Sequence, residues 1–262
     1  MLDQTISWIS QAGGDRADCP TFRPKMEALD LFGKRAFDVT LSAILLVLSA
    51  PLFLLAMVLV KLTSRGPFIY SQVRLGRDRR TFTMYKIRTM AHDCERLTGP
   101  RWSTRDDPRV TPIGRLLRRT HLDELPQLWN VLRGEMSLVG PRPERPEIVR
   151  SLEIAIPRYA DRLAVRPGLT GLAQVQLPPD VDQESVRRKL ALDLRYIERA
   201  NLWLDLRLML CTGLSLVGVP FASSCRLLGL LVSTGAEPSR RARDREGADF
   251  VPSGTLSASR DS

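Results

Sequence analysis

The hydropathy pattern is dominated by one long apolar run. Val39 to Val60 supplies about 22 consecutive uncharged positions, which at ~1.5 Å of rise per residue is enough to cross the hydrocarbon core of a membrane. No other part of the chain is large or apolar enough to surround such a helix inside a soluble core. The pattern therefore predicts a membrane helix over about residues 39–62.

Pro51 falls at the middle of this predicted helix and indicates a bend. Proline removes one helical hydrogen bond, and the hydroxyl of Ser49 is near enough to bond a freed carbonyl. Basic residues flank both ends of the segment: Lys34, Arg35, Lys61 and Arg65. Because positive charge favours the cytoplasmic side, both flanks are predicted there. A re-entrant hairpin kinked at Pro51 satisfies both observations, although proline also bends helices that span a membrane.

Shorter patterns predict a β-hairpin and a basic helix after the membrane segment. Phe68 to Val73 and Thr81 to Arg88 read as two strands around Gly76. Thr111 and Pro112 supply an N-cap and a first-turn proline for a helix that runs to Arg119.

Two later segments have helical patterns. Arg187 to Ala200 is predicted to be a surface helix packed on one side. Leu202 to Val219 is more apolar and is predicted to lie in a membrane interface. From Thr234 onward Ser, Arg, Gly and Pro predominate, which predicts a disordered tail.

These elements predict an α+β fold that is membrane-associated and helix-rich. We expect an N-terminal extension over residues 1–33, a folded domain over 34–218, and an apolar segment with a disordered tail over 219–262. A length of 262 residues with 44% hydrophobic content is sufficient for one ordinary domain with appendages.

A formal net charge of +10 implies an anionic partner. Nucleic acid is disfavoured, because a nucleic-acid surface interleaves aromatic and basic residues, and only Tyr85 and Trp102 are candidates. An acidic membrane or a phosphorylated substrate remains. The four cysteines are scattered without a C-x-x-C pair, so we expect reduced thiols and no structural zinc site.

Two adjacent carboxylates, Asp123 and Glu124, stand in an arginine-rich neighbourhood. Pro126 marks the first turn of a helix that Gly134 ends, so the pair is predicted at a helix N-terminus. That end attracts phosphate and keeps carboxylates ionised. The alternative is that Asp123, or Thr120, merely caps the helix while Glu124 is solvated.

Cations near this pair predict a phosphate site. Lys86 and Arg88 share one face of the second strand, either as phosphate ligands or as a guarded sheet edge. Arg118 precedes the carboxylates, and Arg142 follows them within a proline-rich turn. The Gly-rich stretch from Arg166 to Gly171 predicts a tight loop where backbone approaches a ligand.

Seven motifs in one order resemble the bacterial sugar transferase family of monotopic polyprenyl-phosphate sugar-1-phosphate transferases. They are Lys34-Arg35-Ala36-Phe37-Asp38, Pro51, Tyr85-Lys86-Ile87-Arg88-Thr89-Met90, Asp106-Asp107-Pro108-Arg109, Leu122-Asp123-Glu124-Leu125-Pro126-Gln127, Ser137-Leu138-Val139-Gly140-Pro141-Arg142-Pro143 and Arg166-Pro167-Gly168-Leu169-Thr170-Gly171. The resemblance runs from about Lys34 to Thr212. It departs at Ala50-Pro51, where the family usually carries Ser-Pro.

The resemblance implies an enzyme on the cytoplasmic face of the bacterial inner membrane. It would transfer a sugar 1-phosphate from a UDP-sugar to undecaprenyl phosphate and release UMP, at the first membrane step of glycan synthesis. It also implies that Asp123 is a covalent nucleophile and that Glu124 acts with Mg²⁺, while Lys86, Arg88, Arg118 and Arg142 neutralise phosphate charge. A homodimer is left open.

Two alternatives remain at this point. The first alternative to the covalent mechanism is a non-catalytic scaffold in polysaccharide assembly, which would have no need for the Asp123-Glu124 pair. The second is an enzyme that transfers directly in a ternary complex with Asp123 as general base.

Overall fold

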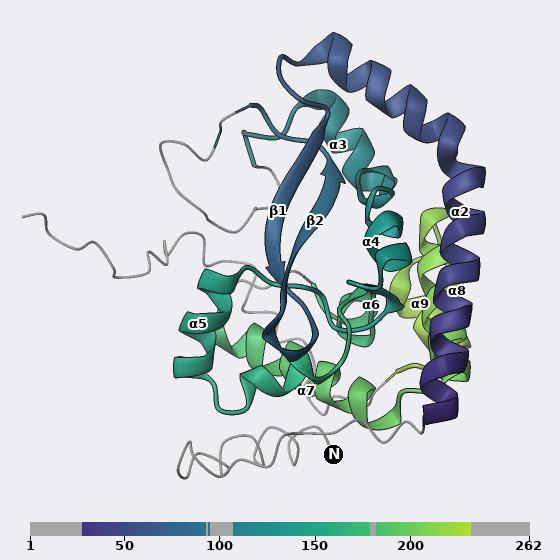
Figure 1. The fold of residues 1–262 in the computed structure, drawn as a ribbon, viewed down its shortest axis with the longest axis vertical. Helices are drawn as coiled ribbons and strands as arrows, with labels where there is room; N and C mark the ends of the chain where they lie inside the picture. The colour runs from purple at the N-terminus through teal and green to yellow at the C-terminus, as the bar shows by residue number, and fades with distance from the viewer. Residues whose placement is uncertain (1–27, 93, 95–106, 179–181, 232–262) are drawn as a thin grey trace, which may run out of the picture.

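The computed structural model describes residues 28–92, 94, 107–178 and 182–231 (Figure 1). Most of the predicted N-terminal extension and the predicted tail from Thr234 lie outside these residues.

One long helix, α2 (Ala28–Thr63), runs along one edge of the molecule. Within the described residues, α2 is the helix whose length and apolar composition would allow it to cross a membrane. Few of its side chains are buried. Pro51 lies inside it, and the axis changes direction along its length, so that its second half leans over the β-hairpin (Figure 1). The apolar helix was thus predicted correctly, but it begins well before residue 39.

The early start of α2 corrects the interpretation of its first basic pair. Lys34 and Arg35 do not flank the helix: they lie within it and bond other elements. Lys34 Nζ contacts Asp205 at 2.5 Å, and Arg35 donates to the carbonyls of Val131 (2.6 Å) and Leu132 (2.9 Å). The first part of α2 is therefore docked onto the folded domain.

The predicted hairpin is confirmed as β1 (Ile69–Leu75) and β2 (Thr81–Ile87), joined through the short 3₁₀ helix η1 (Arg77–Arg79). The strands pair antiparallel in the register Ile69 to Ile87. Alternation along β2 buries Phe82 and Met84 in the core.

A second, parallel pair joins β3 (Ser137–Val139) to β4 (Gly168–Thr170). The stretch over residues 166–171, predicted to be a tight loop, therefore contains a short strand. A Cβ on Gly168 would collide with the backbone of Gly140, and one on Gly140 would collide with the carbonyl of Arg166. These two glycines therefore allow two stretches of this chain to approach each other closely.

Helices of different lengths cover the two strand pairs and enclose the main core. They are α3 (Pro112–Arg119), η2 (Leu122–Glu124), α4 (Gln127–Arg133), α5 (Pro146–Ala155), η3 (Tyr159–Ala164), α6 (Leu172–Gln176), α7 (Gln183–Arg199), α8 (Leu202–Leu216) and α9 (Phe221–Leu227). The prediction of α3 is confirmed, with Thr111 Oγ1 accepting from the amide of Gly114 at 3.0 Å.

The interpretation of α7 as a surface helix was wrong. It starts at a capping box formed by Asp182 and Ser185, and its second half is buried on most sides, including the polar residues Asp193 and Tyr196. Side chains of α7 that lie outside the predicted apolar stripe contact η3, α6 and β3. This helix therefore belongs to the centre of the domain.

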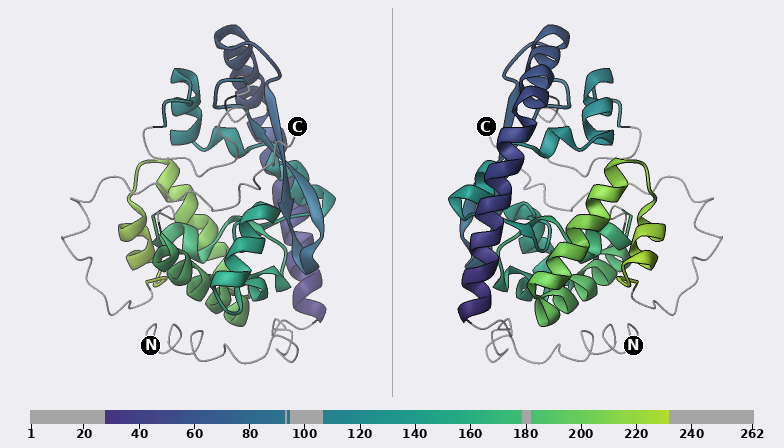
Figure 2. Two further views of the ribbon diagram at one scale, coloured as in Figure 1. Left: turned by 90° about the vertical axis from the view of Figure 1, so that its left-hand side faces the viewer. Right: turned by 90° about the vertical axis from the view of Figure 1, so that its right-hand side faces the viewer.

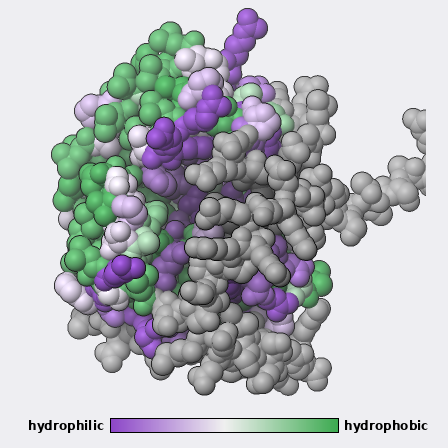
Figure 3. All heavy atoms as spheres, turned by 180° about the vertical axis from the view of Figure 1, so that it is seen from behind, coloured by the Kyte–Doolittle hydropathy of each residue, from purple (hydrophilic) through white to green (hydrophobic). Residues whose placement is uncertain are grey.

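Helices α2 and α8 meet near their first turns and diverge from there (Figure 2). Hydrophobic residues gather on the side of the molecule that these helices form (Figure 3). Exposed apolar side chains on the two helices include Ile44, Val47, Leu48, Leu52 and Leu55 of α2, and Trp203, Leu206, Leu210 and Leu216 of α8. An apolar surface of this extent is typical of a membrane-associated protein.

Candidate active site

The two carboxylates lie in η2, between α3 and α4. His121, the residue before η2, has a left-handed backbone (φ 54°) that turns the chain sharply after α3. The predicted position at a helix N-terminus was wrong, because α4 begins only at Gln127 and its N-cap is Pro126. The alternative of Asp123 or Thr120 as the cap is also contradicted. The Thr120 hydroxyl instead donates to the carbonyl of Leu116 in α3 at 2.9 Å.

Glu124 is paired with two of the predicted cations. Its Oε1 accepts from Lys86 Nζ at 2.8 Å and from Arg142 Nη2 at 2.7 Å. Burial alone raises the pKa of this carboxyl, but Arg142 and Lys86 together hold the pKa well below its usual range. Glu124 is therefore ionised, and β2, η2 and the segment after β3 meet at one atom. Within the described part of the chain, its Oε2 accepts no hydrogen bond.

Asp123 has a different environment from its neighbour. Its exposed fraction is 7%, and among the described residues no hydrogen bond to its carboxylate is found. Burial raises the pKa of Asp123, with Lys86, Arg118 and Arg142 acting in the opposite direction and Glu124 adding to the rise. A buried carboxylate with cations nearby and no donor attached to it retains its lone pairs for a reaction.

The other two predicted cations have different partners. Arg118 Nε donates to Thr89 Oγ1 at 2.9 Å, and its charge still lowers the pKa of Asp123. Arg88 donates to the hydroxyl of Ser64 (2.8 Å) and to its carbonyl (3.1 Å), just beyond the end of α2. The structure thus brings Lys86 and Arg142 onto Glu124 and bonds Arg88 to the residue that follows α2.

A cavity of about 800 Å³ reaches the carboxylate pair at Glu124. Its lining combines paired charged side chains with mostly apolar side chains from α2 and α8. The charged lining residues are Glu124, Arg142, Glu144 and Lys189. The apolar lining includes Leu41 and Leu45 of α2, Met209 and Leu216 of α8, and Phe221 of α9.

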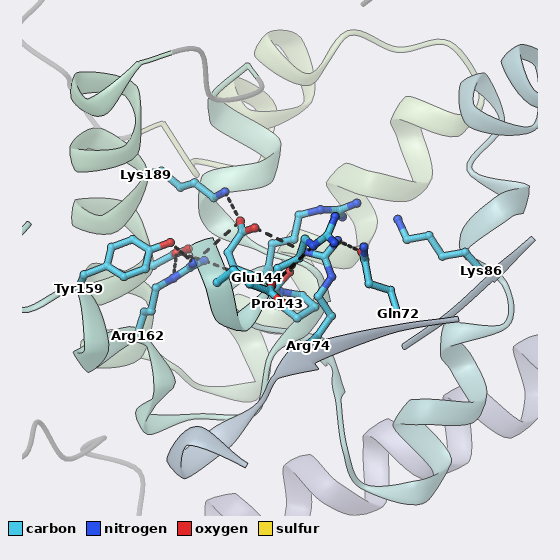
Figure 4. A network of polar contacts seen from close by, with 12 residues as sticks. Gln72, Arg74, Lys86, Pro143, Glu144, Tyr159, Arg162 and Lys189 are labelled. Atoms are coloured by element: carbon cyan, nitrogen blue, oxygen red, sulfur yellow. Dashed lines mark hydrogen bonds and ion pairs between the residues drawn. The ribbon is translucent and has the colours of Figure 1, made fainter. Parts of the chain in front are cut away.

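Glu144 and Lys189 were missed by the sequence reasoning. Lys189 Nζ donates to Glu144 Oε1 at 2.8 Å, and both belong to a polar network that continues to Arg162 and Tyr159 (Figure 4). Burial raises the pKa of Glu144, but Lys189, Arg162 and Arg74 bring it down to about 2. One signal was present: Lys189 and Asp193 place charges one turn apart beside the apolar positions of α7.

The oxygen donors at this site fit a magnesium ion only in part. Asp123 and Glu124 are adjacent carboxylates, and Glu124 Oε2 accepts no bond from the described residues. No group of three or more His, Cys, Asp or Glu side chains gathers in the described part of the chain. Mg²⁺ commonly takes one or two carboxylates and completes its shell with substrate phosphate and water, so this pair would supply only part of the ligands that the ion needs.

Comparison with known proteins gives consistent matches. Residues 29–218 match the family described as Bacterial sugar transferase. The chain is 44% identical over 217 residues to "Undecaprenyl-phosphate glucose phosphotransferase" of Komagataeibacter xylinus, covering 81% of this chain and 41% of that protein. It is 46% identical over 192 residues to "UDP-glucose:undecaprenyl-phosphate glucose-1-phosphate transferase" of Caulobacter vibrioides, covering 72% and 71%.

The chain is also similar to smaller proteins. It is 40% identical over 192 residues to "Exopolysaccharide production protein PSS" of Rhizobium leguminosarum bv. phaseoli, covering 71% of this chain and 96% of that protein. The chain therefore spans less than half of the first relative and nearly the full length of this one.

Proposed function

Because the chain belongs to the bacterial sugar transferase family, we propose that it transfers a sugar 1-phosphate from a UDP-sugar to undecaprenyl phosphate and releases UMP. We place this activity at the cytoplasmic face of the bacterial inner membrane, in exopolysaccharide, capsule or O-antigen type synthesis. The observation that carries the proposal is the contrast within the carboxylate pair. Glu124 is held ionised by two cations, while Asp123 is buried beside them without a hydrogen bond in the described structure.

The proposed reaction proceeds in two displacements at phosphorus. First, an oxygen of Asp123 attacks the sugar-bearing phosphorus of the UDP-sugar, the bond between that phosphorus and the bridging oxygen breaks, and UMP leaves with this oxygen. Second, an oxygen of undecaprenyl phosphate attacks the phosphorus on Asp123, and the carboxylate departs. The sum needs no net proton and forms the undecaprenyl diphosphate sugar.

The cations provide the electrostatic part of this mechanism. Both substrates carry negative phosphate groups, and these repel each other and the attacking carboxylate. Arg142, Lys86 and Arg118 all act electrostatically on Asp123, so phosphate charge that builds up there is neutralised by groups already in place. Glu124 would hold Mg²⁺ through its Oε2, and the ion would add further neutralisation of phosphate oxygens.

The cavity supports the assignment of a lipid acceptor. A polyprenyl phosphate has a charged head and a long apolar chain, and the cavity lining combines charged side chains with mostly apolar side chains from α2 and α8. We propose that the phosphate lies near Glu124 and Arg142 and that the first isoprene units extend between the two helices. The bend of α2 at Pro51 is proposed to be re-entrant, with both ends of the helix on the cytoplasmic side.

The test is a half-reaction followed by mass spectrometry. Purified protein in detergent is mixed with a panel of UDP-sugars without lipid, and we expect one burst of UMP and an adduct of sugar-phosphate mass on Asp123. Asp123→Asn should form no adduct, whereas Asp78→Asn, at an exposed acid of the hairpin tip, should behave as wild type.

The other outcomes identify the alternatives. Normal turnover with both substrates but no adduct after rapid quenching would replace the covalent step with direct transfer in a ternary complex. No UMP release from any UDP-sugar, with folded protein and lipid present, would instead indicate the non-catalytic scaffold.

A further inference from the structure

Arg142 reaches Glu124 from a segment whose backbone accepts four hydrogen bonds from three other elements, β1, η3 and β4. Each carbonyl from residue 141 to 144 accepts a hydrogen bond from outside the segment. The donors are the Gly168 amide to Pro141 (2.9 Å), Arg162 Nη2 to Arg142 (2.9 Å), Arg74 Nη1 to Pro143 (3.1 Å) and the Leu75 amide to Glu144 (3.0 Å). The bonds to the carbonyls of Arg142 and Pro143 come from charged side chains, and Arg162 is the one that bonds Arg142 itself.

Arg162, which donates to this carbonyl, is itself held in place by several other contacts. Its exposed fraction is 3%, and its Nε and Nη2 lie 3.0 and 2.8 Å from Asp193 Oδ2 of α7. Its Nη1 donates to Tyr159 Oη at 2.7 Å, and its guanidinium lies 5.2 Å from the centre of that ring. A planar guanidinium held in this way presents its remaining N–H in one direction.

The network also holds the side chain of Glu144, two residues after Arg142 (Figure 4). Glu144 accepts from Lys189 at 2.8 Å and lies 3.6 Å from Arg74 and 4.0 Å from Arg162. Cations from β1, η3 and α7 thus converge on the carboxylate that follows Pro143. None of these contacts touches Asp123 or Glu124 directly. The network reaches the site through the Gly140–Glu144 backbone and through Glu144 and Lys189, which line the same cavity; the contact of Arg162 with Arg142 is made through the backbone.

We infer that Arg162 is a positioning residue for the transfer reaction: through its bond to the carbonyl of Arg142, it fixes where the Arg142 guanidinium meets the substrate phosphate. This inference rests on the proposed function, in which Arg142 neutralises phosphate charge. Transition-state stabilisation depends on groups held in place beforehand, and a displacement of ~1 Å can cost ~10²-fold in rate. The Arg142 side chain is long and partly exposed, so its guanidinium keeps a fixed position only if its backbone is held.

The test is a double-mutant cycle between Arg162→Gln and Arg142→Ala in the intact protein. UMP release from a UDP-sugar is measured with enzyme in excess, so that very slow variants remain measurable. In the wild-type background we expect Arg162→Gln to lower the rate by ~10- to 100-fold. In the Arg142→Ala background the same change should cost less than ~3-fold, because the group that Arg162 positions is absent.

Two further variants separate positioning from stability. Arg158→Gln removes a buried ion pair within the same part of the chain, 2.7 Å from Asp161, and should lower the melting temperature without changing the rate. Arg162→Lys keeps a charge beside Asp193 but loses the fork, and should be nearly as slow as Arg162→Gln while more stable. If Arg162→Gln does not fold, the Lys variant is used for the cycle.

The outcomes distinguish this inference from the function on which it rests. If Arg142→Ala is slow and Arg162→Gln costs the same factor in both backgrounds, Arg162 is merely structural and the inference is overturned while the proposed function stands. If Arg142→Ala keeps the wild-type rate, the phosphate role of Arg142 is wrong, and the inference fails with it.

Discussion

Lys34 Nζ lies 2.5 Å from Asp205 Oδ2, and this ion pair ties the first part of α2 to the first turn of α8. Asp205 is 1% exposed and also accepts from Tyr196 Oη at 2.8 Å. Burial raises the pKa of Asp205, and Lys34 and the hydrogen bond from Tyr196 act in the opposite direction, so the lysine stabilises the charged form of a buried carboxylate.

Replacing Lys34 with Met should therefore destabilise the fold. Removing one partner of a buried pair leaves an uncompensated charge and typically costs ~3–5 kcal/mol. Denaturant unfolding in a mild detergent measures the change in the free energy of unfolding. The companion change Asp205→Asn, made together with Lys34→Met, should recover part of the loss. An unchanged unfolding midpoint for Lys34→Met would show that the pair contributes nothing.

Asp123→Asn should raise the stability of the protein at neutral pH. Burial raises the pKa of Asp123, so the folded state binds this proton more tightly than the unfolded state does. The associated stability is fully present below the unfolded pKa of about 4 and is lost as pH rises through the folded value. Unfolding midpoints of variant and wild type should therefore differ at pH ~7 and converge in acid. A variant less stable than wild type at neutral pH would contradict this.

A bulky side chain at position 213 should block the lipid acceptor without blocking the donor. Gly213 lies within α8 and lines the cavity, and a Cβ added there meets no atom within 4 Å. Gly213→Phe should lower transfer to undecaprenyl phosphate at least ~10-fold by occupying space needed for isoprene units. The burst of UMP without lipid should persist. Gly213→Ala is the matched control and should add up to ~1 kcal/mol of stability through helix propensity. Equal loss of both half-reactions would place the acceptor elsewhere.

Pro51→Leu should change the membrane topology of α2. The substitution restores the backbone hydrogen bond that proline lacks. In the native chain, Ser49 Oγ donates to the Leu46 carbonyl at 3.4 Å. Single cysteines at Phe32 and Leu62 should both react with an impermeant reagent from the cytoplasmic side in the native chain. In the Pro51→Leu variant the two should react from opposite sides. Opposite-side labelling of the native helix would exclude a re-entrant segment.

Local signals predicted the local elements. The Thr111-Pro112 pair predicted α3, alternation around Gly76 predicted the hairpin, and Gly134 predicted the end of α4, where it has a left-handed φ of 81°. These features depend on residues close together in the sequence, so pattern and capping rules apply to them directly.

Features that depend on distant residues were not predictable in the same way. The glycines of residues 166–171 signalled close backbone approach, but only the folded chain shows that Gly168 approaches Gly140. The same holds for Arg88, whose spacing placed it on the face of Lys86 while its contact is with Ser64. Arg162 and Asp193 are ordinary charges in sequence, and their burial against each other follows from how η3 packs on α7.

The docking of α2 has a consequence for the order in which this protein is made. Lys34 and Asp205 are 171 positions apart, and Asp38 accepts from the amide of Leu138, 100 positions away. At typical rates of synthesis, on the order of 10 to 35 s separates the appearance of Lys34 from that of Asp205. The apolar helix is thus synthesised, and available to a membrane, while its own polar contacts have no partners. The contacts that dock α2 onto the rest of the fold can therefore be completed only after the chain has been synthesised as far as α8.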